Sequence, residues 1–127
     1  MSDIPTDRKY SKSHEWFLVT GDEVIVGITQ FAADALTDVT FVDLPAVGTK
    51  VEAGKPFGEI ESVKATSELF TFIAGEISAI NESLNDSPEL VNSDPYNDGW
   101  MVRIKASDKS ALDSLMDADA YKQMASG

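Results

Sequence analysis

The chain has 127 residues, and its 22 acidic and 10 basic side chains give a net charge of −12. With 43% hydrophobic residues the chain can bury one continuous core, which excludes disorder throughout, and its acidity disfavours nucleic acid, because phosphate contacts need Lys or Arg. The absence of cysteine excludes disulfides, thiol nucleophiles and thiolate metal ligands.

The remaining composition indicates a small protein without a metal or a membrane partner. His14 is the only histidine, so the usual zinc ligands are missing and we predict no metal site. No run approaches the roughly 20 apolar residues that span a membrane, and the start of the chain resembles neither a signal nor a transit peptide. We expect one domain over residues 1–127 that works in the cytoplasm of a bacterium.

The first predicted elements form a hairpin. Residues 1–12 are polar and are expected to be an extended N-terminal segment, so order is predicted to begin near 14–19, an aromatic and β-branched run. The turn pair Gly21-Asp22 separates this run from a second one at 24–28. Two such runs joined by so short a turn indicate antiparallel strands.

A short helix and a further strand follow. Thr29 is placed to cap this helix. One side of the helix is predicted to carry apolar residues, namely Phe31, Ala32, Ala35 and Leu36. The chain then returns to strand at 39–44, and Pro45 ends that strand.

The middle of the chain has short apolar segments and frequent turns, which indicates small antiparallel sheets. Gly54 and Gly75 lie at nearly equal distances from Lys64, each beside a short strand, at 57–63 and 76–80. This spacing suggests that the two strands meet in a hairpin near Lys64.

The C-terminal part is predicted to contain the last strand and a helix. Residues 100–105 alternate apolar and polar side chains, as a strand with one buried face does. After Ser107, a possible cap, a helix is expected to pack one apolar stripe on the sheets. The stripe consists of Leu112, Leu115, Met116 and Met124.

Lys64 is the residue most suggestive of chemistry. It follows a strand run ending at Ile60 and precedes one that restarts at Leu69, which places it at a turn. Its neighbours are small, so an enzyme could reach the amine and an attached group could move. Acylation would replace the positive charge by a neutral amide. The alternative is an ordinary solvated turn lysine.

Short motifs extend this observation to nearly the whole chain. They are Ser13-His14-Glu15-Trp16, Val26-Gly27-Ile28-Thr29, Phe41-Val42-Asp43-Leu44-Pro45, Val47-Gly48, Gly58-Glu59-Ile60-Glu61-Ser62-Val63-Lys64-Ala65, Gly75-Glu76-Ile77, Asn81, Asn92-Ser93-Asp94-Pro95-Tyr96 and Gly99-Trp100-Met101. Each motif alone is weak, but in this order and spacing the chain resembles the H proteins of the glycine cleavage system.

The resemblance implies both a fold and a cofactor. The fold is mainly β, a barrel-sandwich hybrid of the lipoyl and biotinyl type, with two antiparallel sheets, short helices and a C-terminal helix. Lys64 would stand at a hairpin tip and carry lipoic acid through an amide bond. The redox sulfurs would then belong to the cofactor, in agreement with a chain that has no cysteine.

The resemblance also implies a carrier rather than an enzyme, with no catalytic residue of its own. The lipoyl group would receive the aminomethyl group of glycine from the pyridoxal-phosphate-dependent glycine decarboxylase (P protein) and deliver it to the folate-dependent aminomethyltransferase (T protein). Dihydrolipoamide dehydrogenase (L protein) would then reoxidise it. Lipoate-attaching enzymes would be further partners, and the acidic charge predicts salt-sensitive association with basic partner surfaces.

The resemblance also implies roles for five further residues. The loaded arm would fold into a cleft near Ser13, Glu15 and Glu68, where an acid could hold a cationic amine; solvated surface acids are the alternative for both glutamates. Glu59 and Glu61 share one face of a strand, and we expect them to help the modifying enzyme recognise its target lysine.

Other interpretations remain open. A lipoyl or biotinyl swinging-arm domain of another complex would also display a lysine, although its usual methionine or aspartate neighbours are replaced here by Val63 and Ala65. A hydrolase using Glu59 and Glu61 is the rival from another class. His14 is expected to be structural rather than a general base.

One position departs from the pattern of the family. Phe72 stands where many members have proline, between Thr71 and Ile73. Phenylalanine packs against apolar groups and, unlike proline, has a backbone N–H that can donate a hydrogen bond. The sequence therefore does not determine the path of the strand that leaves the hairpin.

Overall fold

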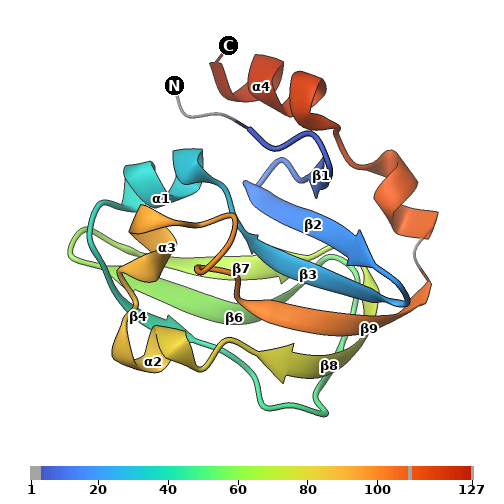
Figure 1. Cartoon of the computed structure of the whole chain (residues 1–127), viewed down its shortest axis with the longest axis horizontal. Helices are drawn as coiled ribbons and strands as arrows, with labels where there is room; N and C mark the ends of the chain where they lie inside the picture. The colour runs from blue at the N-terminus through green and yellow to red at the C-terminus, as the bar shows by residue number, and fades with distance from the viewer. Residues whose placement is uncertain (1–3, 109, 127) are drawn as a thin grey trace.

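The computed structural model describes residues 4–108 and 110–126, which form two antiparallel sheets flanked by short helices. The strands are β1 (Lys9–Tyr10), β2 (Glu15–Thr20), β3 (Glu23–Ile28), β4 (Val39–Asp43), β5 (Lys50–Val51), β6 (Lys55–Ser62), β7 (Thr66–Thr71), β8 (Ala74–Ile80) and β9 (Val102–Asp108). The larger sheet has the order β1-β2-β3-β9-β8-β5 and the smaller one the order β4-β6-β7 (Figure 1).

The helices are short and lie around the sheets. They are α1 (Gln30–Leu36), α2 (Ser83–Asp86), α3 (Leu90–Ser93), the 3-10 helix η1 (Ser110–Ser114) and α4 (Ala118–Ser126). This mainly β architecture of two antiparallel sheets, short helices and a C-terminal helix confirms the fold class inferred from the sequence. Within the described ranges, no helix is long and apolar enough to span a membrane.

The predicted N-terminal hairpin is confirmed as β2 and β3. Thr20 pairs with Glu23 around a two-residue turn, in which Gly21 adopts a positive φ of 68°. Further along the same ladder, Trp16 pairs with Gly27. A Cβ atom on Gly27 would lie 2.6 Å from the Trp16 ring, so glycine makes room for the indole.

Order begins earlier than the sequence predicted. Lys9 and Tyr10 form β1 and pair with Phe17 and Trp16 of β2. The Tyr10 ring is fully buried and stacks on the ring of Tyr121 from α4, with centroids 4.9 Å apart. The prediction that order begins near residue 14 was wrong, because the partner that orders Tyr10 lies at the other end of the chain. Residues 1–3 of the predicted extended segment lie outside the described residues.

Two groups of apolar side chains stabilise the fold. The main core lies between the two sheets, and it includes Phe17 of β2 and Ile60 of β6. A smaller cluster around Trp16, Tyr10 and Tyr121 fills the space between the larger sheet and α4. The C-terminal helix is therefore part of the packed structure.

The strand pairing near Lys64 differs from one prediction. β6 pairs with β7, which follows directly after the turn, and not with residues 76–80. Those residues belong to β8 in the larger sheet, where β8 lies between β9 and β5. Gly75 does not mark a symmetric hairpin; a Cβ there would lie 2.3 Å from the Lys105 carbonyl oxygen, so it permits close approach of β8 and β9.

The prediction of one continuous C-terminal helix after Ser107 is wrong. Ser107 belongs to β9, and η1 and α4 are separate helices. Between them Met116 forms an isolated bridge with Tyr10, in which each backbone N–H donates to the other residue's carbonyl, at 2.8 and 3.0 Å. These bonds to β1 interrupt the helix, and Asp117 starts a new one by accepting a hydrogen bond from Ala120 N at 2.9 Å.

The predicted apolar stripe is divided as a result. Leu112 is buried in the main core, whereas Met116 packs on the smaller cluster and Met124 is 36% exposed. The buried residues of α4 are instead Ala118 and Tyr121.

Phe72 occupies the connection between β7 and β8. Its half-buried ring packs edge-on against Phe17, with centroids 6.1 Å apart, and it contacts the main core. The β6–β7 ladder extends to the pair Lys55–Thr71, so the hairpin is complete with phenylalanine at position 72, where many family members have proline.

The contact between Gly27 and Trp16 can be tested by substitution. Gly27→Ala should lower the free energy of unfolding by about 1–3 kcal/mol, because the new methyl group meets the indole ring. Trp16→Phe removes the contacted ring atoms, so the double variant should lose less stability than the sum of the single variants. Urea unfolding of the four proteins measures this, and simple additivity would contradict the contact.

Candidate functional site

The turn that carries Lys64 is fixed by its own backbone. Ser62 N donates to the Ala65 carbonyl at 2.8 Å, and Ser62 Oγ accepts hydrogen bonds from the backbone N–H groups of Lys64 and Ala65, both at 3.1 Å. Val63 N donates to the Asp38 carbonyl at 3.1 Å, which ties the turn to the loop before β4. Thus the hairpin tip is held, and the Lys64 side chain is its mobile part.

The Lys64 side chain is exposed and lies across the mouth of a cavity. Its Nζ donates to the Ala35 carbonyl oxygen at 3.3 Å, in the last turn of α1. Carbonyl groups at a helix C-terminus carry partial negative charge and favour a cation. The amine is thus oriented by a weak, solvent-exposed contact that acylation would remove.

The space beneath this amine, which we call the Lys64 cavity, has a volume of about 330 Å³. One wall is the apolar side of α1, with Phe31, Ala32, Ala35 and Leu36, as the sequence predicted for one side of this helix. The cap is also confirmed, since Thr29 Oγ1 accepts a hydrogen bond from Ala32 N at 3.2 Å.

The polar side of the Lys64 cavity contains three of the residues singled out by sequence. Ser13, Glu15 and Glu68 all line it together with Lys64. Ser13 and Glu15 come from the start of β2 and the loop before it, and Glu68 comes from β7, the edge strand of the smaller sheet. The structure therefore brings these residues to one place from two different sheets.

Glu15 is a buried acid, only 1% exposed. Its Oε1 accepts hydrogen bonds from the hydroxyls of Ser11 and Ser13, both at 2.5 Å, and its Oε2 accepts one from Phe70 N at 3.1 Å. Burial raises the pKa of this carboxyl, although the three donors oppose that shift. The carboxylate also joins the two sheets, because Phe70 belongs to β7.

His14, which lies between Ser13 and Glu15 in the chain and also lines the cavity, makes structural contacts. It has a positive φ of 72°, a left-handed conformation that histidine tolerates better than most residues. Its Nδ1 lies 2.8 Å from the Tyr121 hydroxyl, and its ring stacks on Phe31 at 4.7 Å between centroids. Burial lowers the pKa of His14, which keeps the ring neutral. These contacts agree with a structural role.

Glu59 and Glu61 lie elsewhere, on the exposed outer face of β6. In the ladders of the smaller sheet, Asp43, Glu59 and Glu68 stand directly opposite one another across the three strands. Like charges in such positions repel each other. The hairpin thus presents an acidic surface, and Phe41, opposite Glu61, adds an apolar side chain that is 47% exposed.

Three contributors to the site were missed by sequence reasoning. Ser11 could have been found, because it alternates with Ser13 and Glu15 along the chain. The Phe70 N–H and the Tyr121 hydroxyl could not have been found from the sequence, because tertiary packing brings them to the site. His14 and Tyr121, for example, are 107 positions apart in the chain. In the part of the chain that the structure describes, no group of three or more His, Asp or Glu side chains could hold a metal ion.

Comparison with known proteins gives one consistent result. Residues 8–127 match the family described as glycine cleavage H-protein. The glycine cleavage system H protein of Chromohalobacter salexigens is 52% identical over 127 residues, covering 99% of this chain and 97% of the relative. That of Halalkalibacterium halodurans is 50% identical over 126 residues, covering 99% and 98%. A crystal structure of the H protein from Mycobacterium marinum matches with a TM-score of 0.88 at 38% identity, covering 98% of this chain and 100% of that one.

The burial of Glu15 predicts a specific pH dependence of stability. A carboxyl whose pKa is raised by folding contributes most to stability when it is protonated, and this contribution is lost as pH rises from its unfolded value of 4.5 through its folded value. The free energy of unfolding of the wild type, minus that of Glu15→Gln, should therefore be larger at pH 5 than at pH 7.5. Urea unfolding measures it; a difference that grows with rising pH would contradict the burial argument.

Proposed function

The chain belongs to the glycine cleavage H-protein family, and we propose that it carries lipoic acid as an amide on Lys64. Members of this family are non-catalytic lipoyl carriers of the glycine cleavage system. Lys64 would hold the lipoyl group, which would supply the redox chemistry; the chain would thereby carry the aminomethyl group of glycine from the P protein to the T protein and present the reduced arm to the L protein for reoxidation. We place this work in the bacterial cytoplasm.

The observation that carries the proposal is the position of Lys64. The turn around it is held by four hydrogen bonds, one of which the Lys64 N–H donates, whereas its side chain is exposed and lines a cavity. A carrier needs both properties, because the attachment point must be presented to several enzymes and the arm must still move. Holding the arm on one protein also raises its local concentration in each complex.

The Lys64 cavity fits a lipoyl arm with a cationic load. The apolar side of α1, together with Ile60 and Leu69, offers contact to hydrocarbon. At the other side, Glu15 offers carboxylate oxygens and Ser13 adds a hydroxyl. Glu68, on the edge strand, lines the cavity but stands opposite Glu59 on the outer face, so we place it where the two surfaces meet. A protonated amine would find acceptors there, and charge-assisted hydrogen bonds of this kind are strong.

The residues of this chain would act by binding and by excluding water. Glu15 is already oriented by its three donors, so it would meet a cationic amine without reorganising. Burial of the load against α1 would keep water from the carbon attached to sulfur. No proton transfer by the chain is needed in this account.

The outer face of the smaller sheet is proposed as the surface read by lipoate-attaching enzymes. Glu59 and Glu61 are exposed there, close to the turn, and they share the face with Asp43 and Phe41. A basic patch on the enzyme would relieve the repulsion among these carboxylates. Such steering fits the net charge of −12.

The two rival interpretations lose their support. Family membership over residues 8–127 decides against the swinging-arm domains of other complexes. A hydrolase would need its two acids to flank a substrate, whereas Glu59 and Glu61 lie on an exposed strand face and do not line the Lys64 cavity.

The attachment site is tested by Lys64→Arg, which keeps the charge but cannot form the amide. After incubation with a lipoate-attaching enzyme, intact mass should show a lipoyl adduct on the wild type and none on the variant. Glycine–bicarbonate exchange with the P protein should fall to background. Lys55→Arg, at an exposed lysine at the other end of β6, the strand that leads into the Lys64 turn, is the control and should behave as the wild type. Exchange that survives Lys64→Arg would disprove the assignment.

The role of the outer face is tested by the double variant Glu59→Gln, Glu61→Gln. Its initial rate of lipoylation should fall about threefold to tenfold at low salt, because two attractive charges are lost. The difference from the wild type should shrink as salt rises. Glu76→Gln, an exposed acid on β8 of the other sheet, is the control and should change little. Equal rates for all three proteins at low salt would show that these glutamates are not recognised.

A further inference from the structure

Tyr121 belongs to α4 and does not line the Lys64 cavity, yet its hydroxyl is bonded to two elements that form the wall of that cavity. The residue is fully buried, and its Oη lies 2.8 Å from His14 Nδ1 and 2.7 Å from Thr29 Oγ1. His14 belongs to the loop before β2, and Thr29 is the N-cap of α1. A single oxygen therefore links α4 to both walls.

We assign the hydrogens around this oxygen so that each of the three polar side chains has a partner. Thr29 Oγ1 accepts from Ala32 N, so its own hydrogen is available for Tyr121 Oη. Tyr121 then donates its hydrogen to Nδ1 of His14, whose ring is neutral with the proton on Nε2. With this assignment each of the three side chains has a partner.

His14 transmits this restraint to the polar wall. Its left-handed backbone must be held by surrounding contacts, and its N–H donates to the Ser11 carbonyl at 3.1 Å while its carbonyl accepts from Thr29 N at 3.0 Å. The residues on either side of it, Ser13 and Glu15, both line the Lys64 cavity. The position of the His14 ring thus determines the path of the chain through these two residues.

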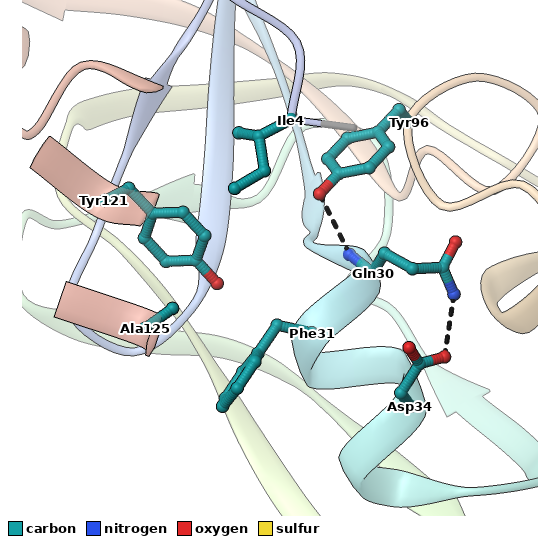
Figure 2. Close-up of a pocket in the computed structure, with 7 residues that line it drawn as sticks. All are labelled: Ile4, Gln30, Phe31, Asp34, Tyr96, Tyr121 and Ala125. Carbon is teal, nitrogen blue, oxygen red and sulfur yellow. Dashed lines mark hydrogen bonds between the residues drawn. The ribbon is translucent and has the colours of Figure 1, made fainter. Parts of the chain in front are cut away.

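His14 also holds the aromatic wall. Its ring stacks on Phe31, which is 45% exposed and separates the Lys64 cavity from a second cavity of about 220 Å³. Figure 2 shows residues that line this second cavity, with Phe31 and Tyr121 on neighbouring sides and Tyr96 across from Tyr121. Because Phe31 borders a cavity on both sides, its tilted ring contact with His14 helps to keep the ring at the wall of the Lys64 cavity.

We propose that Tyr121 is a positioning residue for the arm: its hydroxyl holds His14, and through His14 it fixes the polar and aromatic walls of the Lys64 cavity. The proposal rests on the proposed function, since it concerns how well that cavity retains and protects a loaded arm. It gives α4 a functional role in addition to its packing on β1.

The test compares Tyr121→Phe with Tyr10→Phe. Both changes remove one hydroxyl from a buried ring, and the two rings stack on each other in the same cluster. The Tyr10 hydroxyl, however, donates to the Pro5 carbonyl, away from the Lys64 cavity. A general loosening of the cluster would affect both variants alike, whereas the proposed restraint concerns Tyr121 alone.

The first readout is the titration of His14, followed by NMR in the protein before lipoylation. In Tyr121→Phe the neutral ring loses the donor assigned to its Nδ1, so the pKa of His14 should rise from its wild-type value while burial still holds it below 6.5, and both tautomers should appear. The charged groups lining the same cavity, Glu15, Glu68 and Lys64, remain in both variants. Tyr10→Phe should leave the titration unchanged.

The second readout is the rate at which the loaded, lipoylated protein releases ammonia without the T protein. In this reaction water replaces the sulfur on the methylene carbon, so the products are the free thiol, formaldehyde and ammonia. Release should be about fivefold faster in Tyr121→Phe than in the wild type, the effect expected for one buried hydrogen bond. Lipoate attachment to Lys64 should be unaffected, and Tyr10→Phe should release ammonia at the wild-type rate.

Three results would overturn the proposal: an unchanged His14 titration in Tyr121→Phe, unchanged release despite an altered titration, or the same acceleration in Tyr10→Phe. Failure of the proposed function looks different. In that case the wild type itself carries no lipoyl group on Lys64, and the titration of His14 still decides whether Tyr121 holds this ring.

Discussion

The buried carboxylate of Glu15 is the interaction on which the site depends. It accepts two hydroxyl hydrogens on one oxygen and the Phe70 N–H on the other, and thereby joins β2 of the larger sheet to β7 of the smaller one. Because β7 forms the hairpin with β6, this bond sets the distance between the Lys64 turn and the opposite wall. A buried acid is costly unless it is fully hydrogen-bonded, and here the donors come from both sides of the cavity it helps to form.

This arrangement separates what must be rigid from what must move. The turn, the sheets and α1 are fixed by backbone hydrogen bonds and by the core between the sheets, whereas the Lys64 side chain is exposed and its Nζ donates to the Ala35 carbonyl. In the proposed function, the exposed apolar side of α1 would be the docking surface for the arm, and the acidic outer face would be the surface for basic partners. A carrier needs no more chemistry than this, because the reactive sulfurs belong to its cofactor.

Short sequence patterns correctly predicted the elements that depend on interactions between residues close together in the chain. The β2–β3 hairpin followed from its turn glycine, the start of α1 from Thr29, and the turn of Lys64 from the strand runs on either side of it. The errors lie where distant segments meet. Tyr10 is ordered by Tyr121, and Met116 leaves a helical pattern to bond with Tyr10. The grouping of Ser13, Glu15 and Glu68 was implied by family resemblance, but the burial of Glu15 required the tertiary structure.

The central claim is that the Lys64 cavity receives the loaded arm. It is tested most directly by isotope-edited NMR on the lipoylated protein, with the arm carrying a labelled aminomethyl group. The account predicts nuclear Overhauser contacts from the arm to the methyl groups of Ala32 and Leu36, and arm relaxation as slow as that of the protein. An arm that shows no such contacts and moves independently of the protein would contradict it.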